Sequence, residues 1–560
     1  MNAYVNTYPR PQFRRASFFS LDGKWRLNGK EIEVPFPKES ALSGYPDKEH
    51  EDLLEYHKRF RLPDGFLKKS QKLILHFTAV DQICDVFFND HYLGNHKGGY
   101  LPFEYDVSEY LRKDNYICVK ARDDLDTLYP YGKQSKKPHG MWYTPVSGIW
   151  GSVWLEAVPV RERIKGIKVD TKTGRIRIRV DTDAKAYTFR IIFDEDMYEK
   201  TFKKKEFEID LKALNIKYRK WSPDDPVLYD FSVITRYDKV DSYLAVREVK
   251  TRRVGEYKRL FLNDEPLFVN GVLDQGYFDD GLYLPGDPKE YLSDIRRMKE
   301  LGINLLRKHI KIEPDIFYYY CDREGILVMQ DMVNSGDFRP VMDTVFPTVG
   351  LVNKDDGQRV DEERYAFFIE HSKETIRYLY NHPSIIAWTI YNEGWGQQKS
   401  SEAYHTLKKL DPNRLFDTAS GWFKPNDSDI DSYHVYFRNK VLSAKDKEKL
   451  LFLSEFGGVV RKIEDHIFTE REANYGYGVK NSEAELNKAI LGQYSRMVIP
   501  SIENGLCGCI YTQLSDVEEE VNGLYTYDRE VCKVSKEIMR EIRKMVDNAY
   551  REALRNDQLK

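Results

Sequence analysis

The sequence has few cysteines, and none of them suggests a disulfide scaffold or a metal centre. Only 6 occur in 560 residues, too few to stabilise a protein of this size by disulfide bonds. Cys84, Cys118 and Cys321 lie within apolar runs, so we expect reduced thiols in a protein core. Cys507-Gly508-Cys509 has the spacing of neither a zinc knuckle nor a redox Cys-x-x-Cys motif.

An excess of one charge and a long apolar run are also missing. The 87 basic and 90 acidic residues leave a formal net charge of -3, which gives no broad electrostatic reason to bind nucleic acid or an anionic membrane. No run of 18 apolar residues occurs, and the first residues contain no apolar segment long enough for a signal peptide. We therefore expect a cytoplasmic protein without a nucleic-acid or membrane partner.

Several common catalytic motifs are absent as well. The 12 histidines and 34 glycines form no His-Glu-x-x-His zinc motif, P-loop, Gly-x-Ser-x-Gly elbow or dinucleotide fingerprint. These absences argue against the commonest metal, phosphate and serine-hydrolase chemistries. We expect chemistry that depends on carboxylates and needs neither a cofactor nor a metal.

The chain changes its rhythm twice. Up to about residue 158, short apolar-aromatic runs recur between turns (72–77, 85–89 and 115–119), which predicts an antiparallel β-sandwich. In residues 159–255, the runs 164–180 and 187–193 alternate apolar with polar residues and predict a second, smaller sandwich. From residue 256 to 560, strands alternate with helices, as at the capping box Asp287-Pro288-Lys289-Glu290.

The third region has the size and the strand count of a (β/α)8 barrel. Its predicted strands occupy residues 267–272, 303–306, 326–332, 385–391, 415–418, 432–436, 450–454 and 506–514. Glu393 directly follows the fourth strand, and Glu455 follows the seventh. Because the carboxyl ends of parallel barrel strands open onto one face, both carboxylates are expected there. Two carboxylates that flank a sugar are the equipment of a glycosidase.

Short motifs along nearly the whole chain resemble glycoside hydrolase family 2, which includes β-galactosidases, β-glucuronidases and β-mannosidases. The motifs are residues 147–156 (SGIWGSVWLE) and 221–229, Leu262-Asn263, Val269-Asn270-Gly271-Val272, Gly302-Ile303-Asn304 with Arg307, Asn381-His382-Pro383-Ser384, Asn392-Glu393 and Ser454-Glu455-Phe456-Gly457. The resemblance implies a sugar-binding-like jelly roll (1–158), an immunoglobulin-like sandwich (159–255) and a catalytic barrel (256–560).

By this resemblance, Glu393 is the general acid/base and Glu455 is the nucleophile of a retaining mechanism. Such a mechanism needs the two carboxyl groups about 5 to 5.5 Å apart. The resemblance further implies that Asn392 donates to the sugar 2-hydroxyl, that Arg307 keeps Glu455 ionised and that Tyr436 donates a hydrogen bond to Glu455.

The expected glycone-binding residues depart from better-known members of the family. Asp274-Gln275 stand where a His is frequent, Thr512-Gln513 stand where a Trp is frequent, and His309 follows Arg307 by two positions instead of three. An Asn-x-Lys pair that reads a carboxylate in β-glucuronidases is not apparent in residues 522–533, so we expect a neutral sugar, a β-galactoside first. The further candidates for substrate binding are Asp516 and two tryptophans, Trp395 and Trp422, which are either aromatic platforms or core residues.

Three alternatives stay open. In the first, the glycone is that of a β-glucosidase, β-mannosidase, β-glucuronidase or α-L-arabinosidase. In the second, the barrel binds carbohydrate without catalysis. A metal-dependent hydrolase would use Asp274, His309 and Asp331 as ligands. In each glycosidase case, the expected partner is a carbohydrate substrate that loses its terminal sugar in a pocket, and a homo-oligomer is possible.

Overall fold

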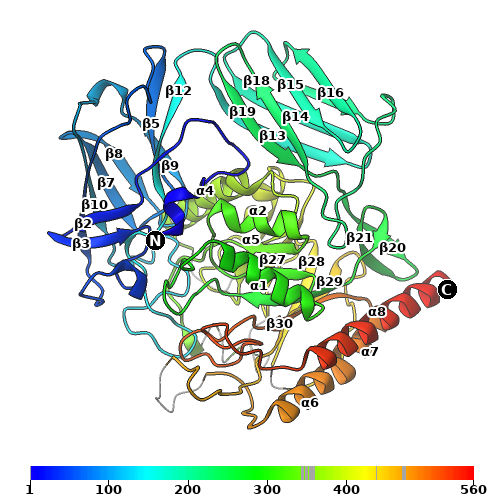
Figure 1. The fold of residues 1–560 in the computed structure, drawn as a ribbon. Helices are drawn as coiled ribbons and strands as arrows, with labels where there is room; N and C mark the ends of the chain where they lie inside the picture. Colours follow the sequence, from blue (N-terminus) through cyan, green and yellow to red (C-terminus); the bar gives the residue numbers. More distant parts are fainter. Residues whose placement is uncertain are drawn as a thin grey trace.

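Two antiparallel β regions and a parallel barrel follow one another along the chain in the computed structural model (Figure 1). The structure describes residues 2–341, 343, 346, 351, 360–436, 438–468 and 475–559. The predicted fold class is confirmed. The domain boundaries after residues 158 and 255 stay predictions.

The N-terminal region packs two main antiparallel sheets around a separate apolar core. In β2, Trp25 and Leu27 are buried while Lys24 and Arg26 are exposed, the alternation of a strand with one face against a core. One sheet has the order β3 (Lys30–Val34), β2 (Gly23–Leu27), β4 (Leu53–Phe60), β10 (Asn115–Arg122), β7 (Ile83–Phe88) and β8 (His91–Lys97). The other has the order β1 (Phe19–Ser20), β12 (Val153–Pro159), β5 (Gln71–Phe77) and β9 (Phe103–Asp106), and β11 (Gly148–Ile149) pairs with β6 (Val80–Asp81). Short 3-10 turns lie at η1 (Ala3–Asn6), η2 (Ala41–Ser43) and η3 (Ser108–Tyr110).

The second region is a smaller β-sandwich with its own core. In β14, buried Ile176, Ile178 and Val180 alternate with exposed arginines, as the sequence pattern predicted. Its sheets have the orders β13 (Ile164–Lys172), β14 (Arg175–Thr182), β17 (Glu206–Asp210) and β16 (Met197–Phe202), β15 (Tyr187–Ile192), β18 (Tyr229–Ile234), β19 (Lys239–Leu244). A three-stranded sheet of β20 (Val249–Val254), β21 (Tyr257–Leu262) and β22 (Glu265–Pro266) connects this region to the barrel.

The third region is the predicted eight-stranded parallel barrel. Its order is β27 (Leu415–Ser420), β26 (Ile385–Asn392), β25 (Leu327–Asp331), β24 (Leu305–Lys308), β23 (Val269–Asp274), β30 (Leu506–Thr512), β29 (Leu450–Gly457) and β28 (Ile430–Val435). The two end strands of this order meet where the Ser432 hydroxyl donates to Asp417 at 2.6 Å. Leu260 and Leu262 of β21 belong to an apolar cluster with side chains of the barrel strands.

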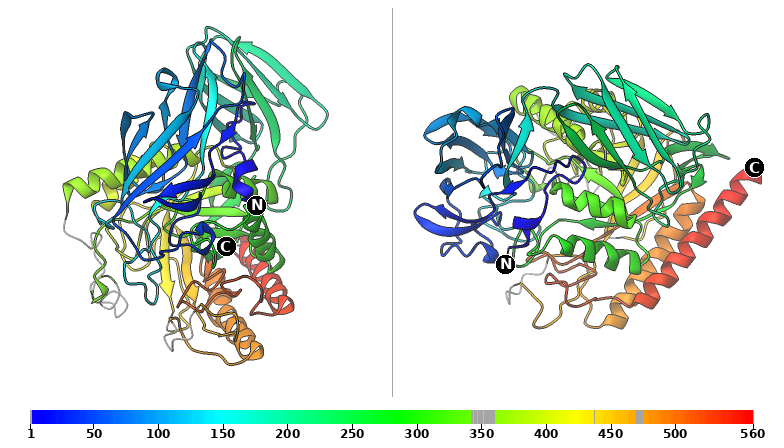
Figure 2. Two further views of the ribbon diagram at one scale, coloured as in Figure 1. Left: turned by 60° about the vertical axis from the view of Figure 1, so that its left-hand side comes forward. Right: turned by 45° about the horizontal axis from the view of Figure 1, so that its top comes forward.

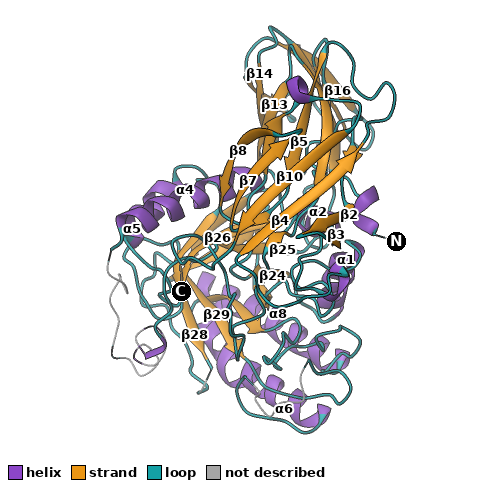
Figure 3. Ribbon diagram, turned by 90° about the vertical axis from the view of Figure 1, so that its left-hand side faces the viewer, coloured by secondary structure: helices purple, strands orange, loops and turns teal. Residues whose placement is uncertain are grey.

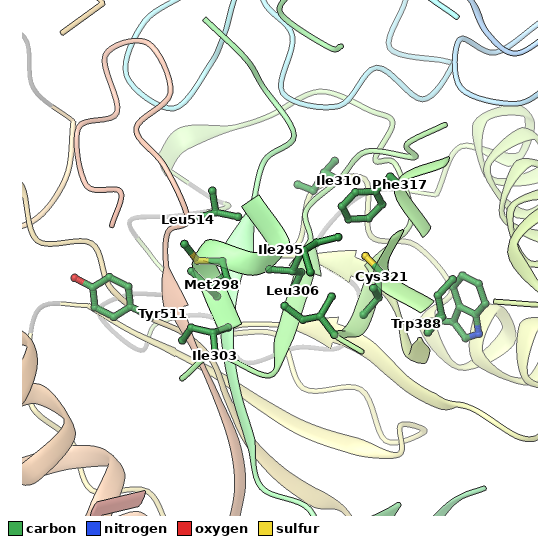
Figure 4. Close-up of a cluster of buried hydrophobic side chains, with 14 of the residues drawn as sticks. Ile295, Met298, Ile303, Leu306, Ile310, Phe317, Cys321, Trp388, Tyr511 and Leu514 are labelled. Atoms are coloured by element: carbon green, nitrogen blue, oxygen red, sulfur yellow. The ribbon is translucent and has the colours of Figure 1, made fainter. Parts of the chain in front are cut away.

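Helices cover the outside of the barrel (Figure 3). They are α1 (Lys289–Glu300), α2 (Asp315–Glu324), α4 (Glu362–Leu379), α5 (Ser400–Lys408), α6 (Glu483–Gln493), the π-helical turn η5 (Tyr494–Val498), α7 (Ile499–Glu503) and α8 (Lys536–Leu559). The predicted capping box precedes α1: the Asp287 carboxylate accepts from the Lys289 N–H at 2.9 Å, and Glu290 accepts from the Asp287 N–H at 3.2 Å. Ile295 and Met298 of α1 pack with Leu306 in the interior (Figure 4).

The two β regions lie on one side of the barrel, and α6 and α8 lie on the far side (Figure 2). The segment between β10 and β11 crosses from the N-terminal region to the barrel. There the Gly140 N–H donates to Glu519 at 2.8 Å and the Thr144 N–H donates to Glu518 at 2.9 Å. The N-terminal region therefore reaches the loop that follows β30.

Candidate active site

A pocket of about 480 Å³, including its part open to solvent, lies at the carboxyl ends of the barrel strands. Six of the residues predicted from the sequence line it: His309, Asn392, Glu393, Trp422, Tyr436 and Glu455. The structure thus brings together side chains that lie up to 146 positions apart in the chain. Arg307 lies directly behind them.

Glu455 lies in β29 and is held by fixed donors. Arg307 Nη1 donates to its Oε1 at 2.9 Å, and the Tyr436 hydroxyl donates to Oε2. Burial raises the pKa of the Glu455 carboxyl, but the electrostatic effects of His434 and of Arg307 outweigh burial and lower the pKa to about 2. Burial and the neighbouring Glu455 raise the pKa of Tyr436 well above its usual value, so the phenol stays a donor.

Arg307 at the end of β24 connects three other strands. Besides Glu455, its guanidinium donates to Asp331 at 3.0 Å and to the Asn392 amide oxygen at 2.8 Å. Burial disfavours its charge, but Asp331 and Glu455 outweigh burial and raise the pKa of Arg307. The amide oxygen of Asn392 is thus occupied, which leaves its NH₂ group as the donor for a ligand in the pocket.

Glu393 follows β26 in a left-handed backbone conformation, with a φ of 53°. Non-glycine residues seldom adopt this conformation, and strained residues of this kind collect at functional sites. Its carboxylate Oε1 lies 2.7 Å from Nδ1 of His434. The other ring nitrogen, Nε2, lies 2.9 Å from the Ser420 hydroxyl and 3.5 Å from Glu455 Oε1.

His434 was not predicted, although it connects the two carboxylates. One ligand atom from each of Glu393, His434 and Glu455 lies within 4.8 Å of the others. The sequence did contain a signal: His434 precedes Tyr436 by two positions, so a strand would turn both side chains to the same face. In β28, Ser432 and His434 are buried in alternation with half-buried neighbours.

His309 lies beside the same cluster in a neutral state. Its Nδ1 is 2.7 Å from Asp331. Burial first, and then the charge of Lys133, lower the pKa of His309 to about 4. Nδ1 therefore carries the proton toward Asp331, and Nε2 is an acceptor.

Besides Arg307, five predicted substrate-binding residues lie outside the set that lines the pocket. Asp274 accepts from Lys308 at 2.6 Å, Asp516 accepts from Lys533 at 2.6 Å, and Gln513 donates to Asn522 at 2.9 Å. Gln275 is buried, and Trp395 stacks on Trp142 with ring centroids 5.3 Å apart. Their roles in substrate binding stay predictions. Among the described residues, Asp274 does not share a ligand cluster with His309 and Asp331.

Several pocket residues were not predicted because they come from loops. They are Lys133 and Met141 from the N-terminal region, Tyr475 and Tyr477 after β29, and Glu520 and Asn522 after β30. Tyr477 stacks on Tyr436 with ring centroids 4.6 Å apart.

In the part of the chain that the structure describes, no helix is both long and apolar enough to cross a bilayer.

Two models of glycoside hydrolase family 2 match the chain: the sugar binding domain over residues 18–159 and the TIM barrel domain over residues 254–452. The chain belongs to glycoside hydrolase family 2.

Curated relatives include enzymes with different glycones. A β-galactosidase of Thermoanaerobacter pseudethanolicus is 25% identical over 369 residues, which cover 62% of this chain and 45% of the relative. A β-glucuronidase of Bacteroides fragilis is 25% identical over 358 residues, which cover 58% of this chain and 48% of the relative. The matched segments thus span less than half the length of these two relatives.

The fold is similar to that of solved structures along most of the chain. A β-D-glucuronidase of Dictyoglomus thermophilum has a TM-score of 0.73 and 17% identity, and the match covers 96% of this chain and 98% of that structure. At this identity, the likeness concerns the fold alone.

Proposed function

We propose that the protein is a retaining, exo-acting glycosidase that removes a terminal β-linked neutral sugar, with a β-galactoside as the first candidate. The observation that carries this proposal is the approach of two buried carboxylates, Glu393 and Glu455, from the ends of different barrel strands. An oxygen of one lies within 4.8 Å of an oxygen of the other. A retaining mechanism uses carboxyl groups about 5 to 5.5 Å apart, whereas an inverting one needs about 6.5 to 9.5 Å to admit a water molecule.

In the first step, Glu455 attacks the anomeric carbon while Glu393 gives its proton to the leaving oxygen. The depressed pKa of Glu455 keeps it ionised for attack. Arg307 and Tyr436 hold one carboxylate oxygen each, so they orient the nucleophile. In the second step, Glu393 takes a proton from water, and this water releases the sugar from Glu455.

Lys133 and Met141 support exo action because both line the pocket and come from the N-terminal region. A pocket that the N-terminal region closes on one side accepts the end of a sugar chain and not its middle. The contacts of Lys533 support a neutral glycone. This lysine is buried, and its ammonium donates to Asp516 at 2.6 Å and to the Val521 carbonyl at 3.2 Å. Its charge is therefore already compensated.

A β-glucuronidase is the second candidate, and Lys133 favours it. The lysine lines the pocket and forms no ion pair with an acidic residue in the described ranges. An ammonium group in this position suits a sugar carboxylate as well as a hydroxyl.

A panel of aryl β-glycosides tests the proposal, with galactoside, glucoside, mannoside and glucuronide at equal concentration. We expect the highest kcat/KM on a neutral glycoside, and NMR of the first product should show the β-anomer. A higher kcat/KM on the glucuronide would favour the second candidate. Absence of turnover on the whole panel, together with binding of a sugar, would favour a non-catalytic carbohydrate-binding protein.

A further inference from the structure

Two buried charged side chains line the pocket without an ion pair to any residue in the described part of the chain. Lys133 is 8% exposed and Glu520 is 4% exposed. They come from opposite ends of the sequence, from the segment between β10 and β11 and from the loop after β30. Burial of a charge without an opposite charge is unfavourable, so such a group is usually compensated by hydrogen bonds or by a ligand.

Glu520 is held in place by neutral donors. The Tyr143 hydroxyl donates to Oε2, and the Asn522 amide donates to Oε1 at 3.1 Å. The Asn522 oxygen in turn accepts from Gln513 at 2.9 Å, which fixes the orientation of the amide. A carboxylate accepts about four hydrogen bonds, so each oxygen of Glu520 keeps capacity for a donor from the pocket. Sugar hydroxyl groups are such donors.

Lys133 lies near the ring of the same tyrosine. Its Nζ is 5.7 Å from the centre of the Tyr143 ring and 5.9 Å from the centre of the Trp395 ring. The Tyr143 N–H donates to the Lys133 carbonyl at 2.9 Å, which fixes the backbone of the loop. The ammonium therefore faces aromatic rings and the pocket, and its N–H groups are donors for a ligand oxygen.

We propose that Lys133 and Glu520 select the glycone by reading neighbouring hydroxyl groups of one sugar ring. Glu520 accepts from a hydroxyl, and Lys133 donates to a sugar oxygen. A neutral hexose satisfies both groups because each hydroxyl is a donor and an acceptor. A sugar with a carboxylate beside Glu520 would bring two negative charges together. This inference rests on the proposed function and assigns the selection to two particular residues.

The test uses the full chain with Glu520→Gln and Lys133→Met. Each variant should lower kcat/KM on the best neutral aryl glycoside by about 10- to 100-fold, mainly through KM, since each loses one hydrogen bond to a charged group. Glu519→Gln and Lys137→Met are matched controls from the same loops. Glu519 bonds to the Gly140 N–H outside the pocket, and Lys137 is exposed, so both controls should stay within about 2-fold of wild type.

Monodeoxy glycosides make the assignment specific. On the monodeoxy glycoside that lacks the hydroxyl bound by Glu520, wild type and Glu520→Gln should have similarly low kcat/KM values. The hydrogen bond to Glu520 is absent in both cases. If the loss of kcat/KM relative to wild type is the same on every deoxy glycoside for both variants, the two residues do not bind individual hydroxyls, and the inference is wrong. Far-UV circular dichroism and unfolding temperatures should match wild type, and Glu520→Asp gives a second variant if the Gln variant does not fold.

Calorimetric binding of galactose and glucuronate separates this inference from the proposed function. Weaker galactose binding by Glu520→Gln, with no turnover by wild type, would overturn the glycosidase proposal and leave the sugar-reading role intact. Unchanged galactose binding in both variants would overturn the role of Lys133 and Glu520, whatever the activity of wild type.

Discussion

The two carboxylates at the barrel mouth lie in opposite surroundings. Glu455 is bound by Arg307, whose charge is permanent, and by the hydroxyl of Tyr436. Glu393 has one side-chain hydrogen-bond partner among the described residues, His434 at 2.7 Å. Arginine stays protonated at all relevant pH values, whereas histidine accepts or donates a proton near neutral pH.

This difference matches the chemistry that the mechanism asks of each group. A nucleophile must stay ionised through the first step, and a permanent charge beside it ensures this. An acid/base must lose and regain a proton in each cycle, and a partner that is itself a donor or an acceptor can follow that change. We infer that the surroundings, more than the carboxylates themselves, divide the two roles.

Removal of the nucleophile should have the largest effect. Glu455→Ala should lower kcat on the order of 10⁵-fold, since no other described group is placed to form the glycosyl-enzyme intermediate. Added azide should restore part of the rate with a dinitrophenyl glycoside and give the α-glycosyl azide by NMR. Turnover near that of wild type would contradict the assignment of Glu455.

Removal of the acid should have a smaller effect that depends on the leaving group. Glu393→Ala should lose about 10²- to 10⁴-fold on an alkyl glycoside, which needs protonation, and far less on a dinitrophenyl glycoside. The measurement is a series of kcat/KM values against leaving-group acidity. An equal loss across the series would make Glu393 a positioning residue and would remove the contrast with Glu455.

The barrel and both carboxylates could be predicted from the sequence because these features depend on local patterns. All eight predicted barrel strands are present, and Glu393 and Glu455 lie at the ends of β26 and β29. Each carboxylate follows a buried apolar run, and such a run specifies where the strand ends. Arg307 and Tyr436 were predicted from the family resemblance. Their contacts agree with the expected geometry.

The rest of the pocket depends on contacts that no local pattern encodes. Lys133 and Glu520 line one pocket because a loop of the N-terminal region crosses to the barrel mouth. Asp274 was predicted because it stands where members of the family often have a His, and Asp516 was a further candidate, but the structure pairs them with Lys308 and Lys533. A polar side chain after a strand turns either into the pocket or toward a neighbouring cation, and the choice depends on tertiary packing.

The charge of Arg307 should control the acid limb of activity. The pKa of Glu455 is depressed to about 2, so its carboxylate is present above that pH and is lost only as the pH falls through it. We expect that the rate of glycosyl-enzyme formation in wild type does not fall through loss of the Glu455 carboxylate as the pH is lowered from 7 to about 4. Arg307→Gln should move the acid limb upward by about 1 to 3 pH units and lower the rate at pH 5.

Trapping with a 2-fluoro glycoside measures this rate without the second step. Arg323→Gln, at an exposed position of α2, is the matched control and should keep the wild-type profile. An acid limb that stays in place in Arg307→Gln would show that Tyr436 and His434 suffice to keep Glu455 ionised.

Replacement of His434 should have the smallest effect on the rate, and this effect should arise from changes at both carboxylates. His434→Gln keeps polar groups near Glu393 but cannot carry a charge. We expect kcat to fall by about 10- to 100-fold on an alkyl glycoside because Glu393 loses its fixed position, with a smaller loss on a dinitrophenyl glycoside. The acid limb should also move upward, because His434 and Arg307 together lower the pKa of Glu455. The exposed His405→Gln is the control. If the loss is equal for both leaving groups and the acid limb does not move, His434 supports the strand packing alone, and the surroundings of Glu393 do not determine its role.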